Sequence, residues 1–172
     1  KARGAKILTR TECCTAVRKG DRWEACLQEK ESQRKITVSA KAIVNAAGPW
    51  VSRVLQDVLE VKSTSGVKLI QGSHFTVPKF YDGHHAYILQ NPDQRVVFVI
   101  PYEEHFTLIG TTDVLYEDDL DNIKISDEET NYLLDSINYY FDANLTRDSI
   151  NWCYSGARSL YNENAKTASR IT

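Results

Sequence analysis

The first forty residues alternate apolar and polar positions in short runs separated by turns. Trp23, Ala25 and Leu27 are spaced two apart, which is the period of a strand with one buried face. Residues 6–17 and 36–40 carry similar runs on either side. The pattern predicts an antiparallel meander of three strands.

The pattern changes after residue 41. Residues 42–47 are nearly all apolar, which is typical of a strand covered on both faces in a parallel sheet. Gly48 and Pro49 end this run, and apolar residues then recur at helical spacing between Val51 and Leu59. The segment therefore predicts a strand, a tight turn and a helix.

From residue 67 onward the chain is rich in predicted strands and contains one clear helix. Ser126 and Glu129 form a capping box in front of an apolar stripe. We place a domain boundary near 62–66, which gives domains 1–62 and 63–172. The predicted strands are 67–77, 87–90, 96–100, 106–110 and 149–156, with a polar loop from Leu160 onward.

Composition narrows the classes of protein that the chain can represent. It has 172 residues, a net charge of −2 and no methionine, even at position 1, so we expect an internal piece of a longer protein. A pI near 6.1 argues against a general nucleic-acid binder. No apolar run approaches the roughly 20 residues of a membrane span. The four cysteines match neither a zinc pattern nor C-x-x-C, so no metal site is predicted.

Four segments carry residues suited to chemistry, and each also has a plain structural interpretation. The turn from Asn45 to Trp50 presents a helix N-terminus that favours an anion such as a pyrophosphate, or is a tight turn without a ligand. His74 can exchange a proton near neutral pH, or is a structural hydrogen-bonding group. Thr111 lies at the tip of a Gly-Thr-Thr strand end, which can bind a polar ligand or only turn the chain. Arg158 suits a phosphate or carboxylate, or is a surface charge.

The order of these segments along the chain is more specific than any one of them. The chain resembles the aerobic, FAD-dependent glycerol-3-phosphate dehydrogenases over essentially its whole length. The blocks that carry the resemblance are Ile43–Val51, Leu69–His74, Tyr87–Gln90, Phe98–Pro101, Ile109–Asp113 and Tyr154–Arg158. The resemblance implies an α+β or α/β fold, in which an antiparallel substrate-binding sheet with helices is attached to part of a Rossmann-type, amino-acid-oxidase-like FAD-binding domain.

The resemblance also implies roles for single residues. Ala47, Gly48 and Trp50 match a flavin-contacting turn. His74 matches a substrate-site histidine beside the flavin, and Arg158 matches an arginine that holds the substrate. The family's G-x-G-x-x-G motif is expected before Lys1, because nothing like it occurs here.

A second phosphate-binding arginine is expected just past Thr172. Arg170 lies three positions too early to replace it.

The activity implied is oxidation of sn-glycerol 3-phosphate to dihydroxyacetone phosphate, with electrons passing through FAD to a quinone. The resemblance places the parent enzyme in the cytoplasm at the inner face of the cell membrane, in peripheral contact through other regions. The isolated chain is expected to be inactive. Two alternatives stay open: a related FAD-dependent oxidase or dehydrogenase of an amino or hydroxy acid, and a non-catalytic binding module.

Overall fold

The computed structural model describes residues 3–61 and 67–161, and the chain divides into two compact units, Lys1–Thr64 and Ser65–Thr172. The domain boundary predicted at 62–66 and the expectations about Arg170 and Thr172 fall outside the described residues. The assignment of a flavin role to one unit and a substrate role to the other stays a prediction.

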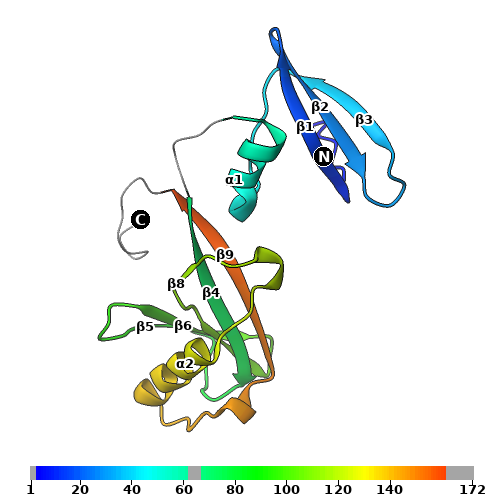
Figure 1. Ribbon diagram of the computed structural model, residues 1–172. Coiled ribbons are helices and arrows are strands. Elements are labelled where there is room, and N and C mark those ends of the chain that lie inside the picture. Colours follow the sequence, from blue (N-terminus) through cyan, green and yellow to red (C-terminus); the bar gives the residue numbers. More distant parts are fainter. Residues whose placement is uncertain (1–2, 62–66, 162–172) are drawn as a thin grey trace. The chain divides into compact units, whose positions relative to one another are not determined.

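The first unit is built on a three-stranded antiparallel sheet in the order β1 (Thr11–Lys19), β2 (Arg22–Glu29) and β3 (Lys35–Ala40) (Figure 1). The predicted meander is therefore confirmed. Its first strand begins at Thr11 and not at residue 6, because Thr11 pairs with Glu29, where β2 ends. The Arg10 carbonyl still accepts from the Lys30 backbone N–H at 2.8 Å, but no described strand lies opposite residues 3–10.

The strand predicted at residues 42–47 is wrong. These residues have no regular secondary structure, and Val44 is 86% exposed. A central parallel strand needs partner strands on both edges, and the described residues of this unit supply only the antiparallel meander. The helix that we predicted next is present as a 3₁₀ turn (Gly48–Trp50), α1 (Val51–Arg53) and a π turn (Val54–Val58).

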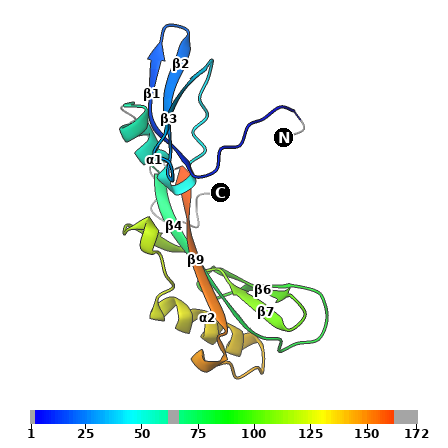
Figure 2. The ribbon, with the colours of Figure 1, turned by 90° about the vertical axis from the view of Figure 1, so that its right-hand side faces the viewer.

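The second unit is built on a six-stranded antiparallel sheet whose central strand is β4. The edge of β4 that carries β7 continues outward to β6 and β5, whereas β9 pairs with the opposite edge (Figures 1 and 2). The strands are β4 (Val67–Pro78), β5 (Tyr87–Gln90), β6 (Val96–Tyr102), β7 (Phe106–Gly110), β8 (Val114–Tyr116) and β9 (Trp152–Tyr161).

Two strands differ from the sequence-based expectation. The three-residue strand β8 was not predicted, because so short a run carries no periodicity. The last strand runs from Trp152 to Tyr161, so the strand predicted from residue 149 is wrong for its first three residues and the polar loop predicted from Leu160 is wrong for its first two. The reason is tertiary, because β4 continues as a partner down to Val67, which pairs with Tyr161.

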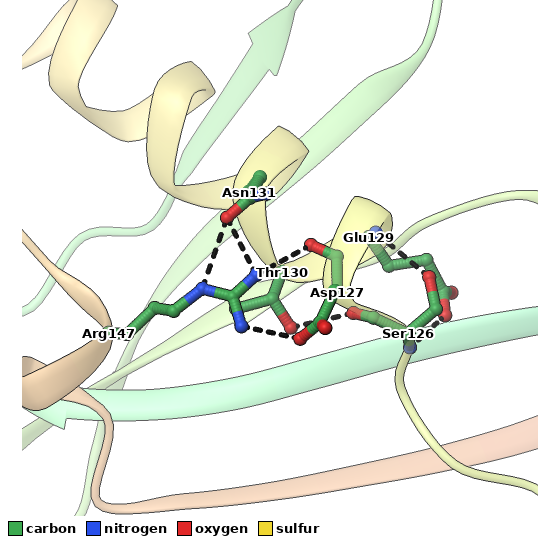
Figure 3. A network of polar contacts seen from close by, with 6 residues as sticks. All are labelled: Ser126, Asp127, Glu129, Thr130, Asn131 and Arg147. Carbon is green, nitrogen blue, oxygen red and sulfur yellow. Dashed lines mark hydrogen bonds and ion pairs between the residues drawn. The ribbon is translucent and has the colours of Figure 1, made fainter.

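One face of this sheet is covered by helix α2 (Asp127–Tyr140). The predicted capping box is present: the Ser126 hydroxyl accepts a bond from the Glu129 backbone, and the Glu129 carboxylate accepts one from the Ser126 backbone (Figure 3). The core between helix and sheet consists of Phe75, Val77, Leu89, Val97, Val99, Ile109, Leu133, Leu134, Ile137 and Leu145. Among the described helices, none combines the length and apolarity needed to cross a bilayer.

Candidate active site

The face of the six-stranded sheet opposite α2 carries three of the sequence-predicted residues. Residues paired across strands share a face, and β4 pairs with β9 through His74 and Tyr154, Gly72 and Gly156, and Ile70 and Arg158. Ser73, the alternate residue, contacts Glu129 of α2. His74, Gly72 and Arg158 therefore lie on the open face, away from the helix.

The two paired glycines form a strip in the middle of this face that has no side chains of its own. Nothing lies within 4 Å of the position that a Cβ of Gly156 would occupy. His74 with Tyr154 bounds the strip at one end and Arg158 bounds it at the other. The four residue steps from His74 to Ile70 span about 14 Å of backbone, and the long Arg158 side chain can reach into that span. The strip is thus uncovered at Gly156, between an imidazole and a guanidinium, whereas Thr111 lies over Gly72.

His74 is held on both sides by its neighbours. Its ring stacks on Tyr154, with ring centroids 4.8 Å apart and planes 1° from parallel. On the other edge it pairs with Gly110, and a Cβ at Gly110 would overlap the imidazole. A side chain at position 110 would therefore displace the ring. The imidazole can lie over β7 because residue 110 is glycine.

The environment of His74 favours the neutral ring. Burial lowers the pKa of His74 below its ordinary value of 6.5. Nδ1 is buried and has no hydrogen-bond partner among the described residues. A hydrogen on Nδ1 would be buried without an acceptor, which is costly, so the neutral ring with its hydrogen on Nε2 is favoured. This tautomer donates from Nε2, and Nε2 accepts a proton only in the tautomer that carries its hydrogen on Nδ1.

Thr111 reaches the strip because the chain bulges between β7 and β8. Both strands pair with the same edge of β4: Gly110 lies opposite His74, and Val114 opposite Gln71. Residues 111–113 therefore face only residues 72–73, so one strand carries an extra residue, as in a β-bulge. The Thr111 hydroxyl comes to lie over Gly72, where a Cβ would overlap its Oγ1. It donates to the Thr112 carbonyl at 3.0 Å, which leaves its lone pairs able to accept from a ligand.

Arg158 projects from β9 and is paired with Asp113. One guanidinium nitrogen, Nη2, donates to Asp113 Oδ1, and both side chains are partly exposed. A guanidinium has five N–H donors, so this pair orients the group and leaves donors for an anion. Asp113 lies in the same bulge as Thr111. The bulge therefore supplies the Thr111 hydroxyl to the strip and the Asp113 carboxylate to Arg158.

The turn predicted to contact a flavin lies in the first unit. Gly48 has φ +55°, a left-handed conformation that glycine adopts readily, and nothing lies within 4 Å of a Cβ built there. The Asn45 side chain fixes the turn by accepting from the Ala47 backbone at 3.2 Å and donating to the Val51 carbonyl at 2.9 Å. Trp50 is 41% exposed. The turn thus offers exposed backbone and an aromatic surface, which fits a contact with a large planar cofactor.

Of the sequence-predicted residues, His74, Thr111 and Arg158 share one face of one sheet, while Ala47, Gly48 and Trp50 share one turn of the other unit. Sequence reasoning missed Tyr154, Asp113 and the Gly72–Gly156 strip as parts of the site. Tyr154, Asp113 and both glycines lie inside the blocks that carried the resemblance. Their functions depend on cross-strand register, which no local pattern encodes.

The chain belongs to the family of FAD-dependent oxidoreductases, which it matches over residues 1–169. It is 45% identical over its whole length to a glycerol-3-phosphate dehydrogenase of Pseudomonas tolaasii, of which it covers 33%. It is also 39% identical, over 99% of its length, to a D-erythritol 1-phosphate dehydrogenase of Brucella abortus, of which it covers 34%.

The fold has a solved counterpart in a glycerol-3-phosphate dehydrogenase of Bacillus halodurans complexed with FAD. The TM-score is 0.81 at 29% identity, over 94% of this chain and 33% of that one. The chain thus spans about a third of the length of these relatives. The predicted family, its fold and its dependence on FAD are confirmed.

Proposed function

We propose that this chain forms the substrate side of an enzyme that oxidises sn-glycerol 3-phosphate to dihydroxyacetone phosphate with FAD. The observation that carries the proposal is the arrangement on the open face of the second unit. There a neutral imidazole, a threonine hydroxyl and a guanidinium surround the Gly72–Gly156 strip. The names of the relatives at 45% and 39% identity support a small polyol phosphate as the substrate.

Arg158 binds the phosphate in this proposal. A guanidinium fork matches two phosphate oxygens and forms charge-assisted hydrogen bonds. The pair with Asp113 limits the rotamers of Arg158 before substrate arrives, so less side-chain entropy is lost on binding.

His74 and Thr111 act on the carbon end of the substrate. Thr111 Oγ1, which lies over Gly72, accepts a hydrogen bond from a substrate hydroxyl and so orients it beside the strip. Since Nδ1 is buried, His74 acts through Nε2: it orients the C2 hydroxyl by donating to its oxygen in the Nε2–H tautomer, or accepts the hydroxyl proton in the Nδ1–H tautomer. Proton acceptance requires the neutral ring that burial favours.

When bound, FAD would supply the redox chemistry, as the acceptor of the hydride from C2. In this proposal Ala47, Gly48 and Trp50 contribute one contact to the cofactor, and the G-x-G-x-x-G motif comes from another part of the longer protein. The isolated chain would then lack activity and stoichiometric FAD.

The remaining proposals concern the whole enzyme. Its electrons would pass to a quinone, and it would contact the inner face of the cell membrane peripherally, from the cytoplasm, through other regions. A soluble substrate phosphate and a lipid-soluble acceptor meet most directly at that surface.

One further substrate is favoured by a specific observation, which is the relative named D-erythritol 1-phosphate dehydrogenase at 39% identity. Its name also denotes a polyol phosphate, so Arg158 would serve it equally well. An amino or hydroxy acid would need Arg158 to bind a carboxylate, which its fork also fits. A non-catalytic binding module would use the same strip without a redox step.

The test is an anaerobic absorbance spectrum of the full-length protein before and after substrate addition. Glycerol 3-phosphate should bleach the oxidised-flavin band rapidly. Bleaching by erythritol 1-phosphate alone, or by an amino or hydroxy acid alone, would still show an FAD-dependent oxidation. It would identify that compound, and not glycerol 3-phosphate, as the substrate. A protein that carries no flavin would overturn the proposal in favour of a binding module.

A further inference from the structure

The covered face of the sheet holds a buried carboxylate directly beneath the candidate site. Glu129 lies in the first turn of α2 and is only 6% exposed. None of its partners among the described residues is a cation, and four hydrogen-bond donors satisfy its two oxygens. They are Ser73 Oγ at 2.8 Å, Gln71 Nε2 at 2.8 Å, the Ser126 backbone N–H at 2.8 Å and Thr112 Oγ1.

Only one of these four donors belongs to the capping box. The Ser126 backbone bond caps the helix (Figure 3), whereas the other three come from the sheet. Gln71 and Ser73 flank Gly72 on β4, and Thr112 lies in the bulge next to Thr111. Capping alone would need none of the three, because a capping glutamate is satisfied by the backbone N–H that it reaches.

The network extends from Glu129 to each backbone segment of the strip. The Ser73 backbone N–H donates to Thr112 Oγ1 at 2.9 Å, which ties the bulge to β4. The Ser73 and Ser155 hydroxyls are 2.9 Å apart. Since the Ser73 hydroxyl hydrogen goes to Glu129, Ser155 is the donor in this pair. Ser155 precedes Gly156, so the carboxylate is connected to β4, to the bulge and to β9.

Thr112 cannot touch a ligand on the open face, because its exposed fraction is 0%. It is nevertheless bonded to Thr111 through the backbone, and its side chain points to the opposite face. An anchored Thr112 hydroxyl therefore sets the height and rotation of Thr111 over Gly72.

We infer that Glu129 is a positioning residue for the candidate active site: its buried carboxylate anchors Thr112, and thereby holds Thr111 over the Gly72–Gly156 strip. This inference rests on the proposed function, in which the substrate binds on the Gly72–Gly156 strip. It adds a residue that contacts neither substrate nor cofactor and that acts from the other side of the sheet.

The test compares three variants of the full-length, FAD-loaded enzyme with a matched control. Thr112→Val removes the hydroxyl and keeps the shape, Thr112→Ser keeps the hydroxyl, and Glu129→Gln keeps the shape but removes the charge. Ser126→Ala is the control, since it removes the side-chain half of the capping box and leaves the sheet network intact. For each variant we would measure kcat and KM well below its thermal midpoint, the flavin spectrum, and hydrogen exchange of the peptide that covers residues 107–113.

We expect kcat/KM to fall on the order of 10²-fold in Thr112→Val and in Glu129→Gln, because small misplacements of orienting groups cost that much. Thr112→Ser should recover activity to within a few-fold, and Ser126→Ala should stay near wild type despite its lower thermal midpoint. Exchange in residues 107–113 should accelerate in the first two variants only.

Normal kcat/KM in Thr112→Val and Glu129→Gln, or an equal loss in Ser126→Ala, would overturn the inference. If the wild-type flavin is not bleached by glycerol 3-phosphate, the proposed function fails. In that case the exchange measurement alone decides the inference, and unchanged exchange in both variants would overturn it.

Discussion

The imidazole of His74 and the phenol ring of Tyr154 stack across β4 and β9, with centroids 4.8 Å apart and planes within 1° of parallel. The stack covers one face of the ring, and Gly110 leaves room for its edge on β7. Both constraints limit the rotation of the ring of His74, to which we assign a role in proton transfer. Tyr154 is itself 40% exposed, so the stacked pair forms part of the open face.

Replacing His74 should impair the chemical step more than binding. We expect His74→Ala in the full-length enzyme to lower kcat by roughly 10²- to 10⁴-fold, the usual contribution of a general base, with a small change in KM. Stopped-flow reduction of the flavin measures this step directly. Tyr154→Leu should give a smaller loss and Tyr154→Phe almost none, since phenylalanine preserves the stack. An unchanged rate of flavin reduction in His74→Ala would remove His74 from the mechanism.

The lowered pKa of His74 makes folding stability depend on pH. Because the folded pKa lies below the unfolded value of 6.5, the unfolded chain binds a proton more readily in the interval between them. The free energy of unfolding should therefore fall as pH decreases from 6.5 toward the folded pKa, and level off below it. Denaturant titrations of the full-length protein at several pH values measure the slope. His74→Phe should flatten it, whereas His105→Asn, on an exposed loop, should not; equal slopes in wild type and His74→Phe would contradict the assignment.

Arg158 should govern the affinity for the anionic end of the substrate. Arg158→Ala removes charge-assisted hydrogen bonds worth about 1.5–3 kcal/mol, so we expect KM to rise roughly 10- to 100-fold with kcat changed less. Arg147 offers a matched control, because it is also ion-paired with an aspartate, Asp127. Its partners Asp127 and Asn131 both belong to α2 and not to the candidate site (Figure 3). Steady-state kinetics of Arg158→Ala and Arg147→Ala make the comparison. A similar KM for both variants would show that Arg158 does not bind the substrate.

Gly156, which pairs with Gly72, and Gly110, which pairs with His74, should respond differently to an added methyl group. At Gly156 the methyl meets nothing within 4 Å, so Gly156→Ala should fold normally and raise KM by occupying the strip. At Gly110 it would overlap the His74 ring, so Gly110→Ala should lower stability by about 1–3 kcal/mol, as overpacking does, and also lower kcat. Thermal unfolding and steady-state kinetics separate the two effects. A normal KM in Gly156→Ala would exclude the strip as the substrate-binding surface.

Much of the second unit was predictable because its signals are local. The capping box of Ser126 and Glu129, the strand Tyr87–Gln90 and the β6–β7 hairpin depend on neighbouring residues in the sequence. Segment 42–47 shows the limit of such reasoning. Its apolar composition predicts a strand, but a strand is defined by its partners, and the described residues provide none for it.

By itself the sequence determined the family, the chemical identity of His74, Thr111 and Arg158, and most of the elements that carry them. Only the tertiary structure decided how they combine. The pairing of β4 with β9 put Gly72 opposite Gly156 and Tyr154 beside His74, and one extra residue between β7 and β8 sent Thr111 to the open face and Thr112 to Glu129. Register and bulges depend on contacts between residues up to about ninety positions apart, and a one-residue shift would turn each of these side chains to the other face.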